Sequence, residues 1–174
     1  MMQTLLLANF IALAAAIIMA LSGLAKSPKK LVAIQSINVI LSIISNLLLQ
    51  SYPGAIINTI SLLRNLIFLK TGQISAITKI LLSCMILYFG LTFNNLALIG
   101  ILPILSSLSY LWLIDTKNKI TFRRLNIISS LLWFVHDLYV LAFTAAIFDF
   151  AAVLTNSYTL SRLPSPKSPH SHKP

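Results

Sequence analysis

The apolar stretch LLWFVHDLYVLAFTAAIFDF, residues 131–150, contains three side chains that could do chemistry: His136, Asp137 and Asp149. The whole chain has three acidic residues, and two of them lie in this stretch, which is one of its most apolar segments. An imidazole and a carboxylate can pass protons or bind a polar ligand, whereas a carboxylate that faces lipid is strongly disfavoured. These side chains are therefore predicted to face water, a ligand or a polar partner.

Each of the three has a structural alternative. Asp149 lines a path or binding site, or it makes a structural hydrogen bond inside a helix bundle. His136 is a proton relay, or a buried neutral histidine bonded to a neighbour. Asp137 lies near the outer end of its segment, where it is either part of the site or simply hydrated.

The composition requires lipid around the chain. Its 174 residues are 57% hydrophobic and 9% charged, with a mean hydropathy of +0.90, whereas a soluble domain carries about 25% charged residues. We expect one polytopic all-α membrane domain over residues 1–163, in which the first 25 residues are a retained span rather than a signal peptide. The Pro/Ser-rich tail, residues 164–174, is expected to be disordered.

The net charge of +10 does not predict a nucleic-acid partner. The basic residues form short clusters between apolar runs instead of one exposed face. The single cysteine, Cys84, cannot build a disulfide or a cysteine-based metal site. We therefore expect membrane lipid around the chain, no nucleic acid, no metal and no cofactor; oligomerisation is left open.

Seven apolar segments of suitable length follow from the breaks at KSPKK, QSYPG, KTGQ, NN and DTKNK and from a softer break near Ala142. They cover residues 4–25, 31–50, 53–69, 74–93, 95–114, 121–141 and 143–162. An arrangement of three, one and three helices is expected, with a first triplet in residues 1–70, a linker helix in 74–93 and a second triplet in 95–163.

Positive charge predicts the orientation of these segments. Basic clusters follow the first, third, fifth and seventh segments, and the other joins contain no Lys or Arg. Because Lys and Arg mark the cytoplasmic side of a membrane protein, we expect the N-terminus outside and the C-terminus in the cytoplasm. Two triplets in the same orientation suggest a repeat, and an offset of about 88 residues places Asn126 on Asn38 and Asp149 on Ser61.

Depth along the helices predicts an outer polar layer. With a rise of about 1.5 Å per residue, His136, Asp149 and Asn46 all lie roughly 20–22 Å from the cytoplasmic side. Polar side chains at this depth are expected to face the bundle interior, because lipid offers them no partners.

An inner polar layer is predicted in the same way. Asn38, Arg64 and Asn156 lie roughly 9–11 Å from the cytoplasmic side. Arg64 either clamps an anion or extends toward the headgroups. The asparagines act either as ligands or as packing contacts between helices. Trp112, near the inner end of its segment, suits an aromatic belt.

No pattern for covalent catalysis is present. The sequence has no phosphate-binding loop, no nucleophile elbow and no glutamate at all. We therefore expect no enzymatic activity and no catalytic residues.

The spacing of several residues resembles the YgjV family of bacterial inner-membrane proteins. The pattern Trp-x-x-His-Asp at residues 133–137 is followed by Asp149 and Asn156, and Leu-Pro at 102–103, Trp112 and Arg123 precede it at matching distances. The resemblance covers roughly residues 30–162. The chain departs from the family where Asp137 replaces an expected asparagine and where a histidine near Asn46 is absent.

The resemblance implies a location in the bacterial cytoplasmic (inner) membrane. It also implies a helix arrangement similar to that of the SWEET and PQ-loop transporters, with Pro103 at the position of a hinge proline. The expected function is transport or binding of a small polar metabolite between two helix triplets. The alternative is a membrane scaffold or assembly protein without cargo.

Overall fold

The computed structural model describes residues 2–22, 28–113 and 119–162. Within these ranges the fold contains seven helices and no strands, so the predicted all-α fold with seven helices is confirmed. The predicted tail, residues 164–174, lies outside the described residues. The helices are α1 (Met2–Ser22), α2 (Pro28–Leu48), α3 (Tyr52–Thr71), α4 (Ala76–Thr92), α5 (Ile101–Leu113), α6 (Lys119–Tyr139) and α7 (Phe143–Arg162).

Local sequence sets several of the helix ends. Pro53 stands in the first turn of α3, where a missing N–H is not needed by the helix. The same helix stops at Gly72, which adopts the left-handed conformation with φ 78°. Ser75 caps α4, and its hydroxyl accepts a hydrogen bond from the Thr78 N–H.

Helix α5 begins at Ile101, six residues later than the predicted start at residue 95. The side chain of Asn94 causes this delay. Its Oδ1 accepts a hydrogen bond from the Leu96 N–H at 3.0 Å, and its Nδ2 donates to the Ala97 carbonyl at 2.7 Å. Ala97 has φ 49°. An asparagine that binds the backbone two and three residues ahead stabilises a turn, which competes with helix.

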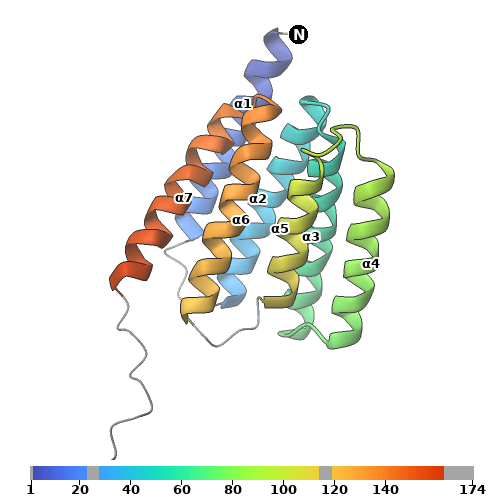
Figure 1. The fold of residues 1–174 in the computed structure, drawn as a ribbon, viewed down its shortest axis with the longest axis vertical. Coiled ribbons are helices and arrows are strands. Elements are labelled where there is room, and N and C mark those ends of the chain that lie inside the picture. Colours follow the sequence, from blue (N-terminus) through green and yellow to red (C-terminus); the bar gives the residue numbers. More distant parts are fainter. Residues whose placement is uncertain (1, 23–27, 114–118, 163–174) are drawn as a thin grey trace, which may run out of the picture.

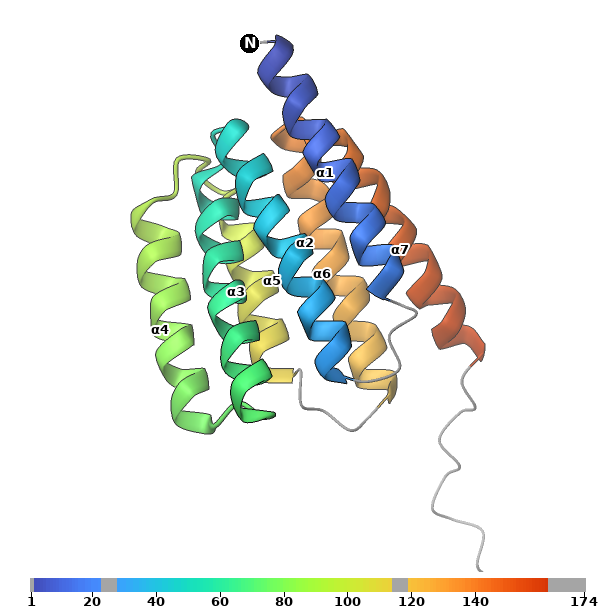
Figure 2. The ribbon, with the colours of Figure 1, turned by 180° about the vertical axis from the view of Figure 1, so that it is seen from behind.

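Six helices form a closed ring in the order α1, α2, α3, α5, α6, α7, with α7 packed on α1. Helix α4 stands outside this ring, where it packs only against α3 and α5 among the described helices (Figures 1 and 2). Consecutive helices run in opposite directions, so α1, α3, α5 and α7 point the same way. We call α1–α3 the first half and α5–α7 the second half. The apolar core lies between α3, α4 and α5 and includes Ile57, Ile86 and Ile104.

Two hairpins of the ring have the same backbone. Every bound of α6 and α7 comes 91 residues after the matching bound of α2 and α3, for example Tyr52 and Phe143 at the two second-helix starts. Gln50 and Leu141 occupy the two turns with φ 57° and φ 62°. The sequence offset of 88 residues was therefore wrong by three, because it was read from a few polar matches instead of the turns.

The 91-residue offset also matches the hydrogen bonds of the two turns. The Ser51 N–H donates to the Asn46 carbonyl at 2.9 Å, and the Ala142 N–H donates to the Asp137 carbonyl at 2.8 Å. At this offset the position of Asp137 corresponds to Asn46, and that of Asp149 corresponds to Asn58. Both acidic positions of the second hairpin thus hold an asparagine in the first.

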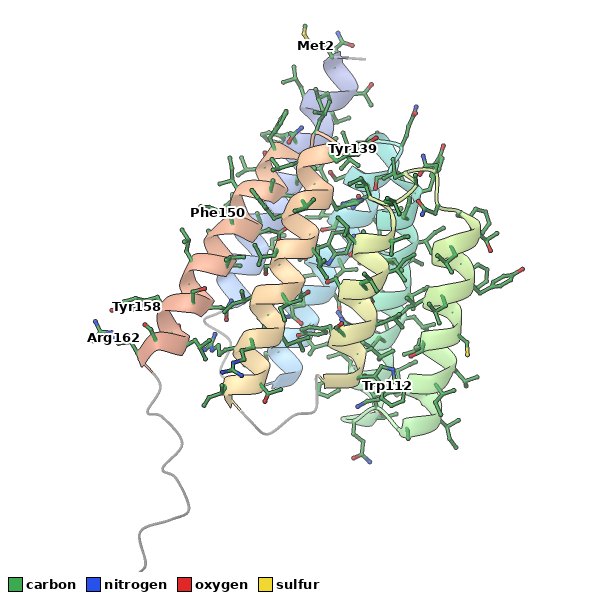
Figure 3. All side chains as sticks on the ribbon, in the orientation of Figure 1. Met2, Trp112, Tyr139, Phe150, Tyr158 and Arg162 are labelled. Carbon is green, nitrogen blue, oxygen red and sulfur yellow. The ribbon has the colours of Figure 1, made fainter. Side chains whose placement is uncertain are left out.

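Large apolar side chains are exposed on the outer faces of the bundle, among them Phe10, Ile77 and Ile147. Figure 3 shows Phe150 and Tyr158 along the outer side of α7, and places Trp112 and Tyr139 near opposite ends of the bundle. No helix in the described part of the chain combines the length and the apolarity needed to cross a membrane.

Candidate functional site

A fully buried histidine connects the two halves of the ring. His136 on α6 places Nε2 at 2.9 Å from the Ser51 hydroxyl, which lies in the turn between α2 and α3. His136 and Ser51 are both 0% exposed. Helix α6 packs directly on α5 and α7 and on neither α2 nor α3. The imidazole therefore crosses the interior of the ring to reach its partner.

The other nitrogen of this imidazole meets an acid. His136 Nδ1 lies 2.8 Å from Asp137 Oδ1. When Nδ1–H donates to Asp137, Nε2 accepts from the Ser51 hydroxyl, since a neutral imidazole has one donor and one acceptor. Trp133 packs edge-on against the His136 ring at 5.4 Å between centroids. The ring is thus held by two hydrogen bonds and one aromatic contact.

The two acidic side chains of this region contact each other. The side chain of Asp137 on α6 lies beside that of Asp149 on α7. Asp137 is buried and Asp149 is half-buried. A protonated carboxyl group can share its proton with a neighbouring carboxylate, whereas two carboxylates cannot hydrogen-bond to each other. Hydrogen-bond distances join Ser51 to His136 and His136 to Asp137, and Asp149 lies next to Asp137. We call these four residues the polar bridge.

The order Ser51–His136–Asp137 is also that of a nucleophilic triad. A substrate carbonyl would have to reach the serine hydroxyl, and Ser51 is 0% exposed. The chemistry that the polar bridge can perform in this conformation is the holding and passing of protons.

Asn46 lies beside the polar bridge. A Cβ atom added to Gly54 would stand 2.4 Å from Asn46 Oδ1 and 2.9 Å from Ser51 Oγ. The two oxygens therefore pack against the same bare backbone position. The predicted outer set of His136, Asp149 and Asn46 is gathered at one end of the bundle, and Asp137 belongs to it.

The predicted inner set is not brought together. Asn38 Nδ2 donates to the Ala15 carbonyl at 2.8 Å, which joins α2 to α1. Asn156 Oδ1 accepts from Arg123 Nη1 at 2.8 Å, which joins α7 to α6. Arg64 contacts neither of these asparagines. Asn38 and Asn156 are thus contacts within each half.

Arg64 is buried, and no carboxylate of the described residues lies beside it. Its side chain is 8% exposed, and its Nε and Nη2 donate to Asn65 Oδ1 at 3.2 and 3.0 Å. Its guanidinium lies 5.0 Å from the centre of the Tyr110 ring. The guanidinium also borders a small cavity between α3, α4 and α5. The two acids in the described part of the chain are both in the polar bridge.

A family model described as bacterial inner membrane protein, Imp-YgjV, matches residues 6–167. The chain belongs to this family. No curated protein and no solved structure matches it. The resemblance read from Trp133, His136 and the residues after them is thereby confirmed.

The Imp-YgjV chain places its predicted hinge in the first turn of a helix. Pro103 is the third residue of α5 and is fully buried. Proline fits the first turn without bending the helix. Just before it, Gly100 lies against α3, since an added Cβ there would stand 2.8 Å from Pro53 Cγ. The hinge role of Pro103 stays a prediction.

Sequence reasoning missed Ser51 and assigned Asn65 no role in the candidate site of this Imp-YgjV protein. Ser51 directly precedes Tyr-Pro-Gly, a pattern that marks a helix start and so places the serine in a turn. That signal gives a location and no partner. Asn65 gave no separate signal, because asparagines inside membrane helices usually serve packing.

Proposed function

We propose that this protein crosses the bacterial inner membrane several times and binds or moves a small polar metabolite between its two halves. The helices are proposed as two parallel triplets, α1–α3 and α5–α7, with α4 as the linker. The N-terminus lies outside and the C-terminus in the cytoplasm. We propose no covalent chemistry for it.

The distribution of basic residues supports this orientation. Lys30, Lys70, Arg123 and Arg162 all lie near the helix ends that share one end of the bundle, the lower end in Figure 1. The turns at the opposite end, at residues 49–51, 93–100 and 140–142, contain no Lys or Arg. Basic residues favour the cytoplasmic side. The polar bridge would then lie toward the outer side.

The outer surface supports membrane embedding. Phe10 on α1 is 71% exposed, Ile77 on α4 is 73% exposed and Ile147 on α7 is 67% exposed. Apolar side chains on several outward faces are costly in water and favourable in lipid. The family description points to the same environment.

One observation carries the proposal of a functional polar site. The first hairpin builds the same turn and helices with Asn46 and Asn58 where the second has Asp137 and Asp149. The fold therefore does not need acids at these positions. Acids are harder to place in a membrane than amides, so their presence on one side only supports a role in binding or proton transfer.

The proposed movement is a rocking of the halves around the Gly100–Pro103 region. The Ser51–His136 hydrogen bond would keep the outer end closed. Opening would separate Ser51 from His136 and expose Asp137 and Asp149 to water and cargo. Proton transfer along the polar bridge would couple this step to pH.

The test replaces the acid pair with the amide pair of the first hairpin. The purified double variant Asp137→Asn/Asp149→Asn and the parent protein are screened by thermal shift against small polar metabolites, and hits are tested for uptake in liposomes. A ligand that binds the folded state raises Tm by mass action. We expect the variant to fold and to lose both the ligand shift and the uptake. A control, Thr155→Ala, changes an exposed side chain far along α7.

The sealed state of the polar bridge favours a second candidate, a membrane scaffold without cargo, since Ser51 and His136 are 0% exposed. A scaffold would show no ligand shift in the parent protein. The double variant of a scaffold would be less stable than the parent protein, but it would have no transport activity to lose. Uptake that persists unchanged in the double variant would refute the role proposed for the acids.

A further inference from the structure

Arg64 is a buried cation, and the described residues around it contribute donors and no acid. Its guanidinium has five N–H donors, and Nε and Nη2 both point at the single acceptor Asn65 Oδ1. The Nδ2 of Asn65 is buried and has no hydrogen-bond partner among the described residues. An excess of buried donors favours a bound acceptor.

The acids of the described chain cannot neutralise this cation. Asp137 and Asp149 contact each other in the polar bridge. Arg64 comes 13 residues after Ser51 along α3, which separates the two regions by about 20 Å at a rise of 1.5 Å per residue. A charge buried without a counter-charge is strongly disfavoured. An anion from solution would supply the counter-charge that the described residues around Arg64 lack.

A cavity opens beside the guanidinium. It is lined by Ile60, Ser61, Arg64, Leu82, Ile86, Ser107 and Leu111, from α3, α4 and α5. The space totals about 150 Å³ including its open mouth, and no part of it is wide enough for a water molecule. The space as it stands is therefore too narrow to hold a ligand, and binding requires the helices around it to separate. Helix α4 packs only on α3 and α5 among the described helices, so its outward shift is the simplest way to enlarge it.

The lining indicates the kind of anion. The guanidinium fork matches two oxygens of a carboxylate. Ser61 and Ser107 also line the space and offer two hydroxyl donors. The remaining walls are the aliphatic side chains of Ile60, Leu82, Ile86 and Leu111. Such walls suit a short hydrocarbon tail and leave a fully polar anion such as phosphate partly unpaired.

We propose that this cavity binds a small carboxylate with a short apolar tail, with its oxygens on Arg64. As the cargo class, this inference rests on the proposed function; as a binding site, it stands separately. The cavity lies where α3 of the first half meets α5 of the second. A bound carboxylate would therefore contact both halves at once.

The probe is propionate, with the uncharged amide propionamide and with sodium chloride at equal ionic strength as comparisons. Thermal shift of the purified full chain is measured for the parent, Arg64→Lys and Arg64→Gln. We expect propionate alone to raise the parent Tm in the millimolar range. Arg64→Lys keeps the charge and loses the fork, so its apparent affinity should fall at least about tenfold.

Two further variants keep the test decisive if Arg64 variants fold poorly. Ser61→Val fills the cavity from a half-buried position and should abolish the propionate shift. Arg123→Gln removes the other arginine that bonds an asparagine, Asn156, and should retain the shift. Equal shifts in the parent and in Ser61→Val, or equal shifts with propionamide, would overturn the site.

The outcomes also separate the site from the proposed function. If uptake of a neutral or cationic metabolite depends on Asp137 and Asp149 and propionate does not bind, the proposed transport function is supported and the carboxylate site is refuted. If propionate binding depends on Arg64 and no cargo is taken up, the carboxylate site is supported and the proposed transport function is refuted.

Discussion

The α2–α3 hairpin and the α6–α7 hairpin have helices of equal lengths and turns with the same hydrogen bonds, yet only the second holds acids. The first has Asn46 and Asn58 at the positions of Asp137 and Asp149. The first also holds Arg64, where the second has Thr155. One backbone thus presents an amide pair and a cation in one half, and a carboxyl pair in the other.

The comparison of the two hairpins separates features that the fold requires from side chains that the fold holds for another purpose. Features shared by both hairpins, such as the left-handed turn residues Gln50 and Leu141, belong to the scaffold. Features present in one hairpin, such as the neighbouring side chains of His136, Asp137 and Asp149, have no scaffold role that the other hairpin also needs. Four pairs of matched substitutions test this division.

The largest effect is expected at the position of His136. His136→Ala leaves a cavity and removes the partner of both Ser51 and Asp137, at a cost of about 3–4 kcal/mol of unfolding free energy. The matching variant Ser45→Ala removes one hydrogen bond to the Ala8 carbonyl, which costs about 1 kcal/mol. Denaturant titration in micelles measures both. Equal losses would show that the two positions do the same structural work.

The next effect concerns a missing Cβ. Gly54→Ala places a methyl group within 2.9 Å of both Asn46 Oδ1 and Ser51 Oγ, which should cost about 2 kcal/mol through overpacking. The second hairpin already has Ala145 at this position, and Ala145→Gly should cost about 0.5–1 kcal/mol. Melting curves of the two variants give the comparison. A Gly54→Ala protein more stable than its parent would mean that Asn46 moves aside freely.

A smaller effect is expected from the asparagines that hold the two turns. Asn9 donates to the Leu141 carbonyl at 3.0 Å and accepts from the Thr144 N–H at 3.1 Å, whereas Asn95 donates to the Gln50 carbonyl at 2.8 Å. Asn9→Ala should therefore cost about 1–2 kcal/mol and Asn95→Ala about 0.5–1 kcal/mol. Hydrogen exchange of the turn amides provides the measurement. The opposite ranking would contradict the assigned contacts.

The smallest effect should follow from relaxing the turns themselves. Gln50→Gly and Leu141→Gly remove a side chain from a left-handed backbone position, which should stabilise the protein by about 0.5–1 kcal/mol each. Thermal unfolding would detect both changes. Stabilisation in one turn alone would show that the two turns are not equivalent.

The sequence predicted the helices well because their ends are marked by local chemistry. Charged clusters and the Tyr-Pro-Gly pattern interrupt the apolar runs, and the observed helices follow these breaks. The late start of α5 was missed because Asn94 sustains a turn through its own side chain. Local hydropathy does not contain that information.

The sequence predicted a depth for each polar residue along its helix, but it did not predict the direction in which the side chain points. A rise of 1.5 Å per residue gives height along a helix. It grouped His136 and Asp149 in one predicted layer, and both residues lie in the polar bridge. It does not give the rotation of each helix about its axis. Asn38 therefore meets α1, Asn156 meets Arg123, and Arg64 meets Asn65, although all three share a predicted depth.

The contact between Asn9 and Leu141 has a consequence for synthesis in the cell. These residues are 132 positions apart, and a chain emerges from the ribosome at roughly 5–20 residues per second. Among the described helices, α1 is synthesised before α2 and long before α7. It can pack against α2 early, but the face that packs against α7 stays uncovered until α7 is made. A ribosome stall or a truncation before residue 141 would therefore leave the ring open at one seam. Quality-control proteases that recognise unpaired helix faces would then recognise α1, the first of the described helices to be synthesised.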